Sequence, residues 1–523
     1  MKRWARTYRG ALAGLLAGGL LLTGCGGGGG STRDLSGDGR RAADGPVPPP
    51  AQGSARGATQ GSTEGSTEGA AQGEDSGRKD PAPPPDYLST FALDVDTASY
   101  GFARRTLAEG RLPAPETVRP EEFVNSFRQN YPQPDGNGFS VTVDGARTND
   151  DNWSLVRVGL ATRSSPSGER PPAALTFVVD ISGSMAEPGR LDLVKRSMGI
   201  MTGQLRADDS IALVTFSDRA ETRLPMTRLD GNRRRVHEVV DGLAPTDSTN
   251  VEAGVRRGYD VAVEGRRPGA TNRVVLLSDA LANTGETSAD AILERIEDAR
   301  REHGITLFGV GVGSEYGDAL MERLADRGDG HTTYVSDDEG ARKVFCEQLP
   351  ANVGLRARDA KAQVAFDPQT VEQFRLIGYD NRRVADEDFR DDRVDGGEVG
   401  PGHTVTALYA VRTRPGAAGH VATATVRWLD PQTRAPHEQS GQVESGALAG
   451  RLWANANPRL QVTAVAAYLA SALREPAGTW KPMPGALPLA ELADHAADLA
   501  ARTEDDAVRQ LSTAVSQANR LQE

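Results

Sequence analysis

Four short apolar runs alternate with amphipathic stretches through the middle of the chain, residues 171–350. The runs LTFVVD, SIALVTF, NRVVLLSD and ITLFGVGVG are rich in β-branched and aromatic residues and lack polar alternation, as strands buried on both faces do. Between them, stretches such as RLDLVKRSMGIMTGQL and NVEAGVRRGYDVAVE place apolar residues at helical spacing. Alternation of strand and helix predicts βαβ units, and we therefore expect an α/β domain with a doubly wound, mostly parallel central sheet.

The pattern changes on both sides of this domain. Residues 87–170 hold a strand candidate, two short amphipathic helices and the alternating segments FSVTVDGAR and WSLVRVGLA, which predict a small α+β unit. Residues 351–523 begin with segments that alternate in the same way, such as GHTVTALYAVR, and are helical and alanine-rich from Arg459 onward. We expect a C-terminal β-then-α domain there.

The first 24 residues have the pattern of a bacterial secretion signal. A basic start, MKRWARTYR, precedes an apolar segment over residues 11–22 that is shorter than the roughly 20 residues of a membrane-spanning helix. The segment ends in LLTGC, which resembles a bacterial lipobox. The resemblance implies that Cys25 is lipidated and becomes the mature N-terminus, on the extracytoplasmic face of the cell membrane. An uncleaved signal anchor is the alternative.

Residues 25–86 have a composition that cannot form a core. They contain the repeat GSTEGSTEG, end near PAPPP and have almost no large apolar residue. Such a segment behaves as a disordered tether, because it buries too little apolar surface to offset the entropy of folding. At roughly 5–6 Å times the square root of the residue number, it would reach about 45 Å from a lipid surface.

The overall composition narrows the class of partner. The 523-residue chain is 38% hydrophobic and 25% charged, which is ordinary for a globular protein. Its net charge of -12 argues against a nucleic-acid partner, because nucleic-acid-binding proteins carry a basic face, and the cluster Arg233–Arg235 lies on a predicted helix whose solvated side explains it. The two cysteines, Cys25 and Cys346, lie in different settings, so we expect neither a disulfide framework nor a cysteine metal site.

Oxygen-bearing side chains follow the strands of the predicted parallel sheet. Asp180, Ser182 and Ser184 come at alternate positions just outside the first buried run, LTFVV. Thr249 precedes a predicted helix, and Asp279 ends the run NRVVLLSD. Because the carboxyl ends of parallel strands meet at one edge, these five side chains should cluster, and their hard oxygen atoms suit Mg²⁺, Mn²⁺ or Ca²⁺ rather than a soft metal.

The order D-x-S-G-S, then a loop threonine, then an aspartate after an apolar strand resembles the metal-ion-dependent adhesion site of von Willebrand factor type A domains, which have a Rossmann-like fold. The resemblance implies that Ser182 and Ser184 bind the ion directly, Thr249 directly or through water, and Asp180 and Asp279 mainly through water. A carboxylate from a protein partner would complete the coordination. The last motif is commonly T-D-G, whereas this chain has Ser-Asp-Ala at that place.

The resemblance extends beyond the central domain. The segment STFALDVDTASYGFARRTLAEGRLPAPETVRPEEFVNSF is similar to the N-terminal segment of a bacterial lipoprotein family in which it precedes the type A domain, and the C-terminal part is similar to the tail domain of that family. We therefore expect a lipid-anchored protein that binds an acidic group of a partner protein through a divalent ion, with Mg²⁺ as the first candidate and Mn²⁺ or Ca²⁺ as alternatives. An ion that only stabilises the loops is a second interpretation of the same residues.

An enzyme is the alternative from another class. Asp94 and Asp96 in LDVDTASY resemble a phosphatase motif, and Asp96 with Thr97 resembles an aspartic protease motif, but both motifs are incomplete. A helix cap by Asp96, Thr97 or Ser99, or an interdomain hydrogen bond, explains this segment without any reaction. Ser184 lies in SGSMA and not in the G-x-S-x-G of a nucleophile elbow. We expect no enzyme activity, and a metal-dependent hydrolase using Asp94 and Asp96 remains the alternative.

Overall fold

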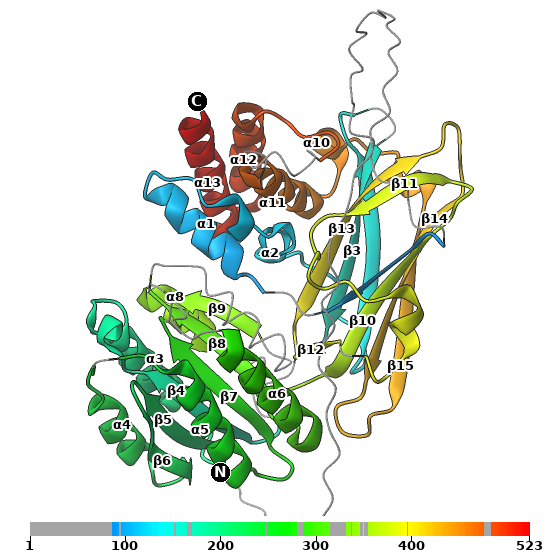
Figure 1. Cartoon of the computed structure of the whole chain (residues 1–523). Helices are drawn as coiled ribbons and strands as arrows, with labels where there is room; N and C mark the ends of the chain where they lie inside the picture. Colours follow the sequence, from blue (N-terminus) through cyan, green and yellow to red (C-terminus); the bar gives the residue numbers. More distant parts are fainter. Residues whose placement is uncertain are drawn as a thin grey trace, which may run out of the picture. The chain divides into compact units, whose positions relative to one another are not determined.

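The computed structural model describes residues 86–93, 96–150, 153–164, 170–246, 248–279, 286–313, 331–335, 337–345, 349, 354–394, 396–474 and 483–523. These residues all belong to one compact unit, Lys79–Glu523. It contains three groups of elements: a mostly parallel sheet between helices, a pair of antiparallel sheets and a set of C-terminal helices (Figure 1).

The buried apolar runs form the centre of a six-stranded sheet with the order β6-β5-β4-β7-β8-β9. All neighbouring strands are parallel except β6, which runs antiparallel to β5 at the edge. The strands are β4 (Ala173–Asp180), β5 (Ser210–Phe216), β6 (Ala220–Arg228), β7 (Thr271–Ser278), β8 (Thr306–Val312) and β9 (His331–Val335).

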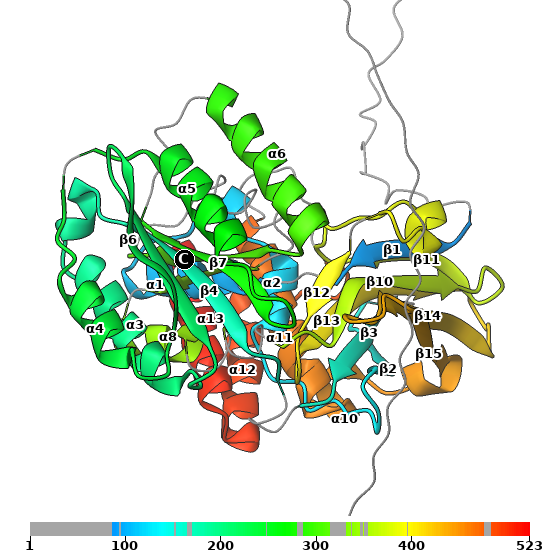
Figure 2. The same ribbon diagram turned by 90° about the horizontal axis from the view of Figure 1, so that it is seen from below.

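Helices cover both faces of this sheet, as Figure 2 shows from below. They are α3 (Leu191–Gln204), α4 (Arg233–Asp241), α5 (Val251–Glu264), α6 (Glu286–His303) and α8 (Asp338–Lys343). Alternate residues of β4 point to opposite faces: Phe177 packs in the core beneath α3 and α4, whereas Val178 packs in the core beneath α5 and α6. Both faces are therefore apolar, which explains the unbroken hydrophobic runs.

Two antiparallel sheets pack face to face around a shared core that includes Phe91, Val158, Val364 and Tyr409. The first has the order β1-β10-β14-β15 with β12 beside β10, and the second has the order β11-β13-β3-β2. Their strands are β1 (Leu88–Ala92), β2 (Phe139–Arg147), β3 (Trp153–Thr162), β10 (Ala357–Phe366), β11 (Val371–Leu376), β12 (Gly397–Val399), β13 (Thr404–Thr413), β14 (His420–Leu429) and β15 (Pro436–Glu444).

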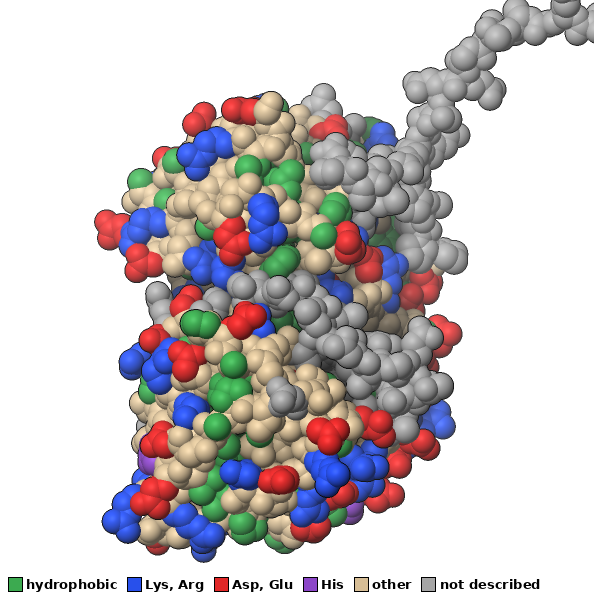
Figure 3. Space-filling model, turned by 60° about the vertical axis from the view of Figure 1, so that its left-hand side comes forward, with side chains coloured by type: hydrophobic (Ala, Val, Ile, Leu, Met, Phe, Trp, Pro, Cys, Tyr) green, Lys and Arg blue, Asp and Glu red, His purple; other side chains and the backbone are tan. Residues whose placement is uncertain are grey.

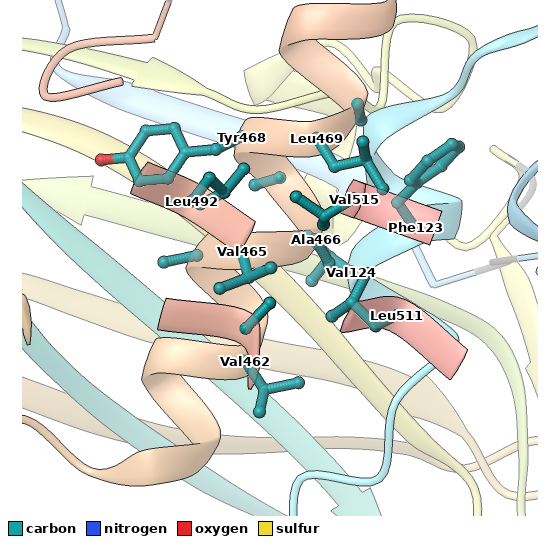
Figure 4. Packing of buried hydrophobic residues seen from close by; sticks show 14 of the residues in the cluster. Phe123, Val124, Val462, Val465, Ala466, Tyr468, Leu469, Leu492, Leu511 and Val515 are labelled. Carbon is teal, nitrogen blue, oxygen red and sulfur yellow. The ribbon is translucent and has the colours of Figure 1, made fainter. Parts of the chain in front are cut away.

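The C-terminal helices share another core with helices from the N-terminal segment. Phe123 and Val124 of α2 pack among Val465 and Leu469 of α11 and Leu511 of α13 (Figure 4). The helices are α1 (Ala98–Ala108), α2 (Pro120–Asn125), α10 (Leu452–Asn455), α11 (Pro458–Arg474), α12 (Leu489–Thr503) and α13 (Asp506–Gln522), and the short 3-10 helices are η1 (Pro115–Thr117), η2 (Gly183–Ala186), η4 (Asp386–Arg390) and η5 (Ser445–Leu448).

The α/β fold with a central, doubly wound, mostly parallel sheet is confirmed. The two flanking segments, however, are interleaved rather than separate. β1 from residues 87–170 pairs with β10 from residues 351–523, and β3 pairs along its whole length with β13. The pattern of a strand identifies the strand but not its pairing partner. The strands of one sandwich were therefore assigned to two separate units.

The surface carries charged side chains of both signs. On the face seen in Figure 3, Lys and Arg side chains are interspersed with Asp and Glu side chains. None of the helices in the described ranges combines the length and the apolar character that crossing a membrane requires.

Candidate metal-ion site

The predicted ligands lie where two neighbouring parallel strands end. β4 and β7 run side by side in the middle of the sheet, with Val179 opposite Leu277. Asp180 is the last residue of β4, and Asp279 directly follows β7. The loops after these strands therefore meet at the carboxyl edge of the sheet, where doubly wound folds bind their ligands.

Asp180 is fully buried, at 0% exposure, although the sequence placed it outside the buried run. Its Oδ1 accepts a hydrogen bond from the backbone N–H of Ser182 at 2.8 Å, and its Oδ2 accepts one from the Ser278 hydroxyl at 2.6 Å. Burial raises the pKa of Asp180, the hydrogen bonds oppose the rise, and the charge of Asp279 adds to it. Asp180 thus supports the loop after β4 from behind and ties it to the end of β7.

The hydroxyl groups of Ser182 and Ser184 lie in the loop that Asp180 holds. The chain turns through η2 after β4, which leaves Ser182 buried and Ser184 exposed. The Oγ atoms of Ser182 and Ser184 are 3.2 Å apart, and the Ser184 hydroxyl donates to Oδ1 of Asp279 at 2.9 Å. A continuous run of oxygen atoms therefore leads from the interior to the surface.

Arg190 also belongs to this site, although it is not among the residues predicted from the sequence. Its Nη1 donates to Oδ2 of Asp279 and, at 3.1 Å, to the backbone carbonyl oxygen of Ser184, while its Nη2 lies 2.8 Å from Oε2 of Glu187. Arg190 directly precedes α3 and follows Ser184 by only a few residues. No motif distinguishes it in the sequence, so that only the folded loop reveals its role.

Thr249 lies half-buried on the neighbouring loop between α4 and α5. This loop is fixed at both ends: the N–H of Thr246 donates to the carbonyl oxygen of Ile181 at 2.6 Å, and the N–H of Asn250 donates to that of Ser217 at 2.7 Å. Thr249 itself makes no hydrogen bond with any other described residue. Hydrogen bonds thus bring four of the five predicted ligands together and place the fifth on the adjacent loop.

The donor set fits a hard divalent cation. Hydroxyl and carboxylate oxygens from Ser182, Ser184 and Asp279 are within hydrogen-bond distance of one another in a chain, and oxygen is the ligand that Mg²⁺, Mn²⁺ and Ca²⁺ prefer. Over the described ranges, His, Cys, Asp and Glu side chains form no metal-binding group of three or more. An ion at this edge would therefore depend on the serine hydroxyls, which add no charge and leave it attractive to an external anion.

Asp96, the residue of the hydrolase alternative, lies away from this edge and has partners of its own. It is 5% exposed, its Oδ1 accepts from the backbone N–H of Thr332 at 2.8 Å, and its Oδ2 lies 3.4 Å from Nη2 of Arg382. Thr97, one of the three residues expected to cap the helix, occupies the N-cap of α1, but its side chain makes no cap hydrogen bond. Asp96 instead joins the six-stranded sheet to the rest of the unit by hydrogen bonds.

A cavity of about 460 Å³ opens beside Asp96. Its polar lining includes Asp96, Thr97, Asn125, Arg128 and His403. Asp94 lies outside the described residues, so the carboxylate pair of the hydrolase hypothesis is not seen together. The predictions for Cys25 and Cys346 also fall on residues outside the described ranges.

Comparison with known families agrees with this geometry. Residues 174–346 match the family described as von Willebrand factor type A domain, and residues 74–157 match the one described as von Willebrand factor. Residues 353–449 match the family described as Uncharacterized protein YfbK, C-terminal. The fold and the family matches together define a von Willebrand factor type A domain protein.

The order of these three matched parts makes the chain a YfbK-like protein. It is 35% identical over 333 residues to Uncharacterized protein YfbK of Escherichia coli, which covers 62% of this chain and 57% of the relative. It is 25% identical over 212 residues to human inter-alpha-trypsin inhibitor heavy chain H3, covering 39% of this chain and 24% of that one. The chain thus spans well under two thirds of the length of either relative.

Among solved structures, the chain is similar to one described as von Willebrand factor type A from Catenulispora acidiphila. The match has 15% sequence identity and a TM-score of 0.47, and it covers 74% of this chain and 91% of that one.

Proposed function

We propose that this protein captures an acidic group of a partner protein through a divalent cation held at the carboxyl edge of the type A sheet. Ser182 and Ser184 would hold the ion directly, Thr249 directly or through water, and Asp180 and Asp279 mainly through water. Bound there, the ion supplies a positive centre for a carboxylate of the partner, with Mg²⁺ as the first candidate and Mn²⁺ or Ca²⁺ as alternatives. Type A domains commonly mediate protein binding, which supports this class of partner.

The observation that carries the proposal is the run of oxygen atoms from Ser182 through Ser184 to Asp279. Behind it, Asp180 holds the loop with both carboxylate oxygens hydrogen-bonded, so the hydroxyls are oriented before any ion arrives. A site whose ligands are already in place loses less entropy on binding than one that must form. The same run of neutral hydroxyls supports partner capture over a purely stabilising ion, because it leaves the ion under-neutralised.

Calorimetric titration with Mg²⁺ and Mn²⁺ tests the ion. Asp180→Asn keeps the size of the side chain and its capacity to accept a hydrogen bond but removes the charge, and we expect it to abolish binding while the melting curve stays cooperative. Ser184→Ala should weaken binding less, because it removes one neutral ligand. Asp218→Asn, at a side chain 77% exposed in a surface pair with Arg219, is the matched control and should bind as wild type does. Unchanged affinity in Asp180→Asn would contradict the proposed site.

Partner capture needs a second experiment, on the part of the chain after the tether. The purified protein, immobilised with Mg²⁺ or with EDTA, should retain a partner only with Mg²⁺, and Asp180→Asn should retain none. A synthetic peptide rich in Asp and Glu is a defined probe for the acidic group. Retention that is equal in EDTA would mean that binding does not use the ion.

The lipid anchor is part of the same proposal. LLTGC after a basic and apolar leader supports lipidation of Cys25, with the tether over residues 25–86 holding the folded part outside the membrane. Cys25→Ala should abolish incorporation of radiolabelled palmitate and release the protein from the membrane fraction. Persistent labelling of this variant would refute the lipobox assignment without affecting the ion site.

A further inference from the structure

We infer that Arg190 is a tethered cation that competes with the divalent ion for Asp279, and so sets the ion affinity of the site. This inference rests on the proposed function, because it concerns the regulation of the same site. Its basis is a set of contacts that no sequence motif specifies: Arg190 holds Asp279, the backbone of Ser184 and Glu187 together.

Both carboxylate oxygens of Asp279 are in use. Oδ1 accepts from the Ser184 hydroxyl, and Oδ2 accepts from Nη1 of Arg190. The side chains of Asp279 and Arg190 are only 3% and 13% exposed, so water screens their pairing little. Asp279 supplies negative charge that a divalent ion needs, and the guanidinium already neutralises it. An ion at this edge must therefore share the carboxylate with a second cation, and two cations at close range repel each other.

Glu187 is a second carboxylate that Arg190 can pair with. Its Oε2 lies 2.8 Å from Nη2 of Arg190, and its side chain is 64% exposed at the rim of the site. One guanidinium with five donors thus bridges an inner carboxylate, Asp279, and an outer one, Glu187. Arg190 can leave Asp279 and keep Glu187, so an arriving ion does not have to expose an unpaired arginine.

The stem of Arg190 stays close to the backbone at the end of β8. A Cβ atom added at Gly313 would lie 3.3 Å from Nε of Arg190 and 3.7 Å from Cγ, and Gly313 has φ +111, which disfavours any other residue. Gly313 therefore leaves room beside the Arg190 side chain that a Cβ atom would take, including room at Nε of the guanidinium. The competitor that we propose has two positions, one over the site and one at its rim.

The competition makes opposite predictions for Arg190 and for its outer partner, Glu187. Arg190→Gln removes the competing charge and should tighten Mg²⁺ and Mn²⁺ binding by about tenfold or more, since a tenfold change corresponds to about 1.4 kcal/mol. Glu187→Gln removes the outer position, so Arg190 stays on Asp279 and the ion should bind several-fold more weakly. In the double variant, the effect of Glu187→Gln should disappear, because non-additivity reports that residues act through one another.

Calorimetric titration of the four proteins with MgCl₂ and MnCl₂ measures this cycle. Arg196→Gln is the matched control: its side chain is 49% exposed, it pairs with Asp192 and Asp338 on the surface, and its replacement should leave the affinity unchanged. Thermal melting in EDTA is a readout that needs no ion. In EDTA, the melting temperature of Arg190→Gln should be below that of wild type. Added Mg²⁺ should raise the melting temperature of Arg190→Gln more than that of wild type. If Arg190→Gln does not fold, Arg190→Lys replaces it: it keeps the charge but cannot bridge both carboxylates, and its affinity for the ion should exceed that of wild type.

The outcomes separate the two proposals. If wild type binds the ion and Arg190→Gln binds it equally or more weakly, Arg190 positions Asp279 instead of competing for it, and this inference alone fails. If neither protein binds the ion, both this inference and the proposed function fail. Binding by Arg190→Gln that is tighter than that of wild type, or seen only in the variant, supports both.

Discussion

Asp180 is 0% exposed, and each of its carboxylate oxygens accepts a hydrogen bond. These two hydrogen bonds hold the loop after β4 in place. A buried charge without partners is costly, whereas one that accepts strong hydrogen bonds can fix a loop. The Ser278 hydroxyl is one of these donors, and it comes from the neighbouring strand. Ser278 therefore influences the proposed ion site without belonging to the predicted set of ligands.

Ser278→Ala should lower the free energy of unfolding and weaken ion binding. The substitution leaves Oδ2 of Asp180 without the 2.6 Å hydrogen bond from this hydroxyl, and an acceptor buried without its donor costs about 1–3 kcal/mol. Urea unfolding measures the stability, and Mn²⁺ calorimetry measures the binding. Ser278→Thr keeps the hydroxyl and should retain most of both, so equal losses in the two variants would show that packing and not the hydrogen bond is responsible.

At this scale the sequence predicted residues whose chemistry is local. Asp180, Ser182 and Ser184 follow one strand at fixed spacing, and Asp279 ends another, so their convergence follows from the topology of a parallel sheet. Arg190 was not predictable, because an arginine before a helix has many possible partners. Only the folded loop directs its guanidinium to Asp279.

Among the elements, β4 is fixed at its beginning as well as at its end. Asp209, fully buried before β5, accepts from the backbone N–H of Ala173 at 2.7 Å and from that of Arg206 at 2.6 Å. It also pairs with Arg170 through both carboxylate oxygens, at 2.8 and 2.5 Å. Burial would raise the pKa of Asp209, but the bonds from Arg170 and the two N–H groups lower it overall. The start of β4 is therefore held by an ionised carboxylate.

Asp209→Asn should destabilise the protein at neutral pH and progressively less in acid. The folded pKa lies below the unfolded value of about 3.9, so the stabilisation is complete above that value and is lost as the pH falls through the folded pKa. Removing one partner of a buried pair typically costs about 3–5 kcal/mol, and the amide retains part of the hydrogen bonding. Urea midpoints of wild type and variant at pH 7, 5 and 3 measure the difference. A difference that stays constant over this range would mean that the charge of Asp209 is not what stabilises β4.

The sequence predicted buried elements better than edge elements. The four apolar runs all became strands of the central sheet, because burial on both faces leaves an unmistakable pattern. β6 and β9 at the two edges were not predicted: AETRLPMTR is polar and contains Pro225, and HTTYV is short. Edge strands carry charges and proline because they face water on one side, and this removes the signal that identifies them.

At the scale of the whole unit, the type A sheet is joined to the rest of the unit by buried charged groups. Arg273 of β7 and Glu398 of β12, only 1% and 4% exposed, form an ion pair at 3.1 Å. Burial lowers the pKa of Arg273, and the charge of Glu398 acts against this. Asp96 makes a second connection, through Thr332 of β9 and Arg382. The sequence offered an interdomain hydrogen bond for Asp96 but not its partners, and it did not indicate the pair of Arg273 and Glu398, because each connection joins residues more than a hundred positions apart.

Asp96 distinguishes the binding protein from the hydrolase, and its replacement is the decisive test at this scale. Asp96→Ala leaves the Thr332 N–H and Arg382 without this carboxylate, so we expect a loss of about 1.5–3 kcal/mol in the free energy of unfolding, the range for hydrogen bonds to charged groups. Asp96→Asn can still accept from Thr332 and should lose less. Both variants should bind Mn²⁺ as wild type does, since Asp96 lies away from the ion site.

Three measurements on the same preparations test these expectations. Urea unfolding measures the stability, and Mn²⁺ calorimetry measures the ion binding. Assays with and without Mg²⁺ measure phosphatase and peptidase activity. Asp218→Ala, at a side chain 77% exposed, is the control and should change the stability by no more than about 0.5 kcal/mol. A stable Asp96→Asn protein that has lost a Mg²⁺-dependent hydrolysis shown by wild type would reverse the assignment. The cavity beside Asp96 would then be an active site, and the ion at the sheet edge would be secondary to it.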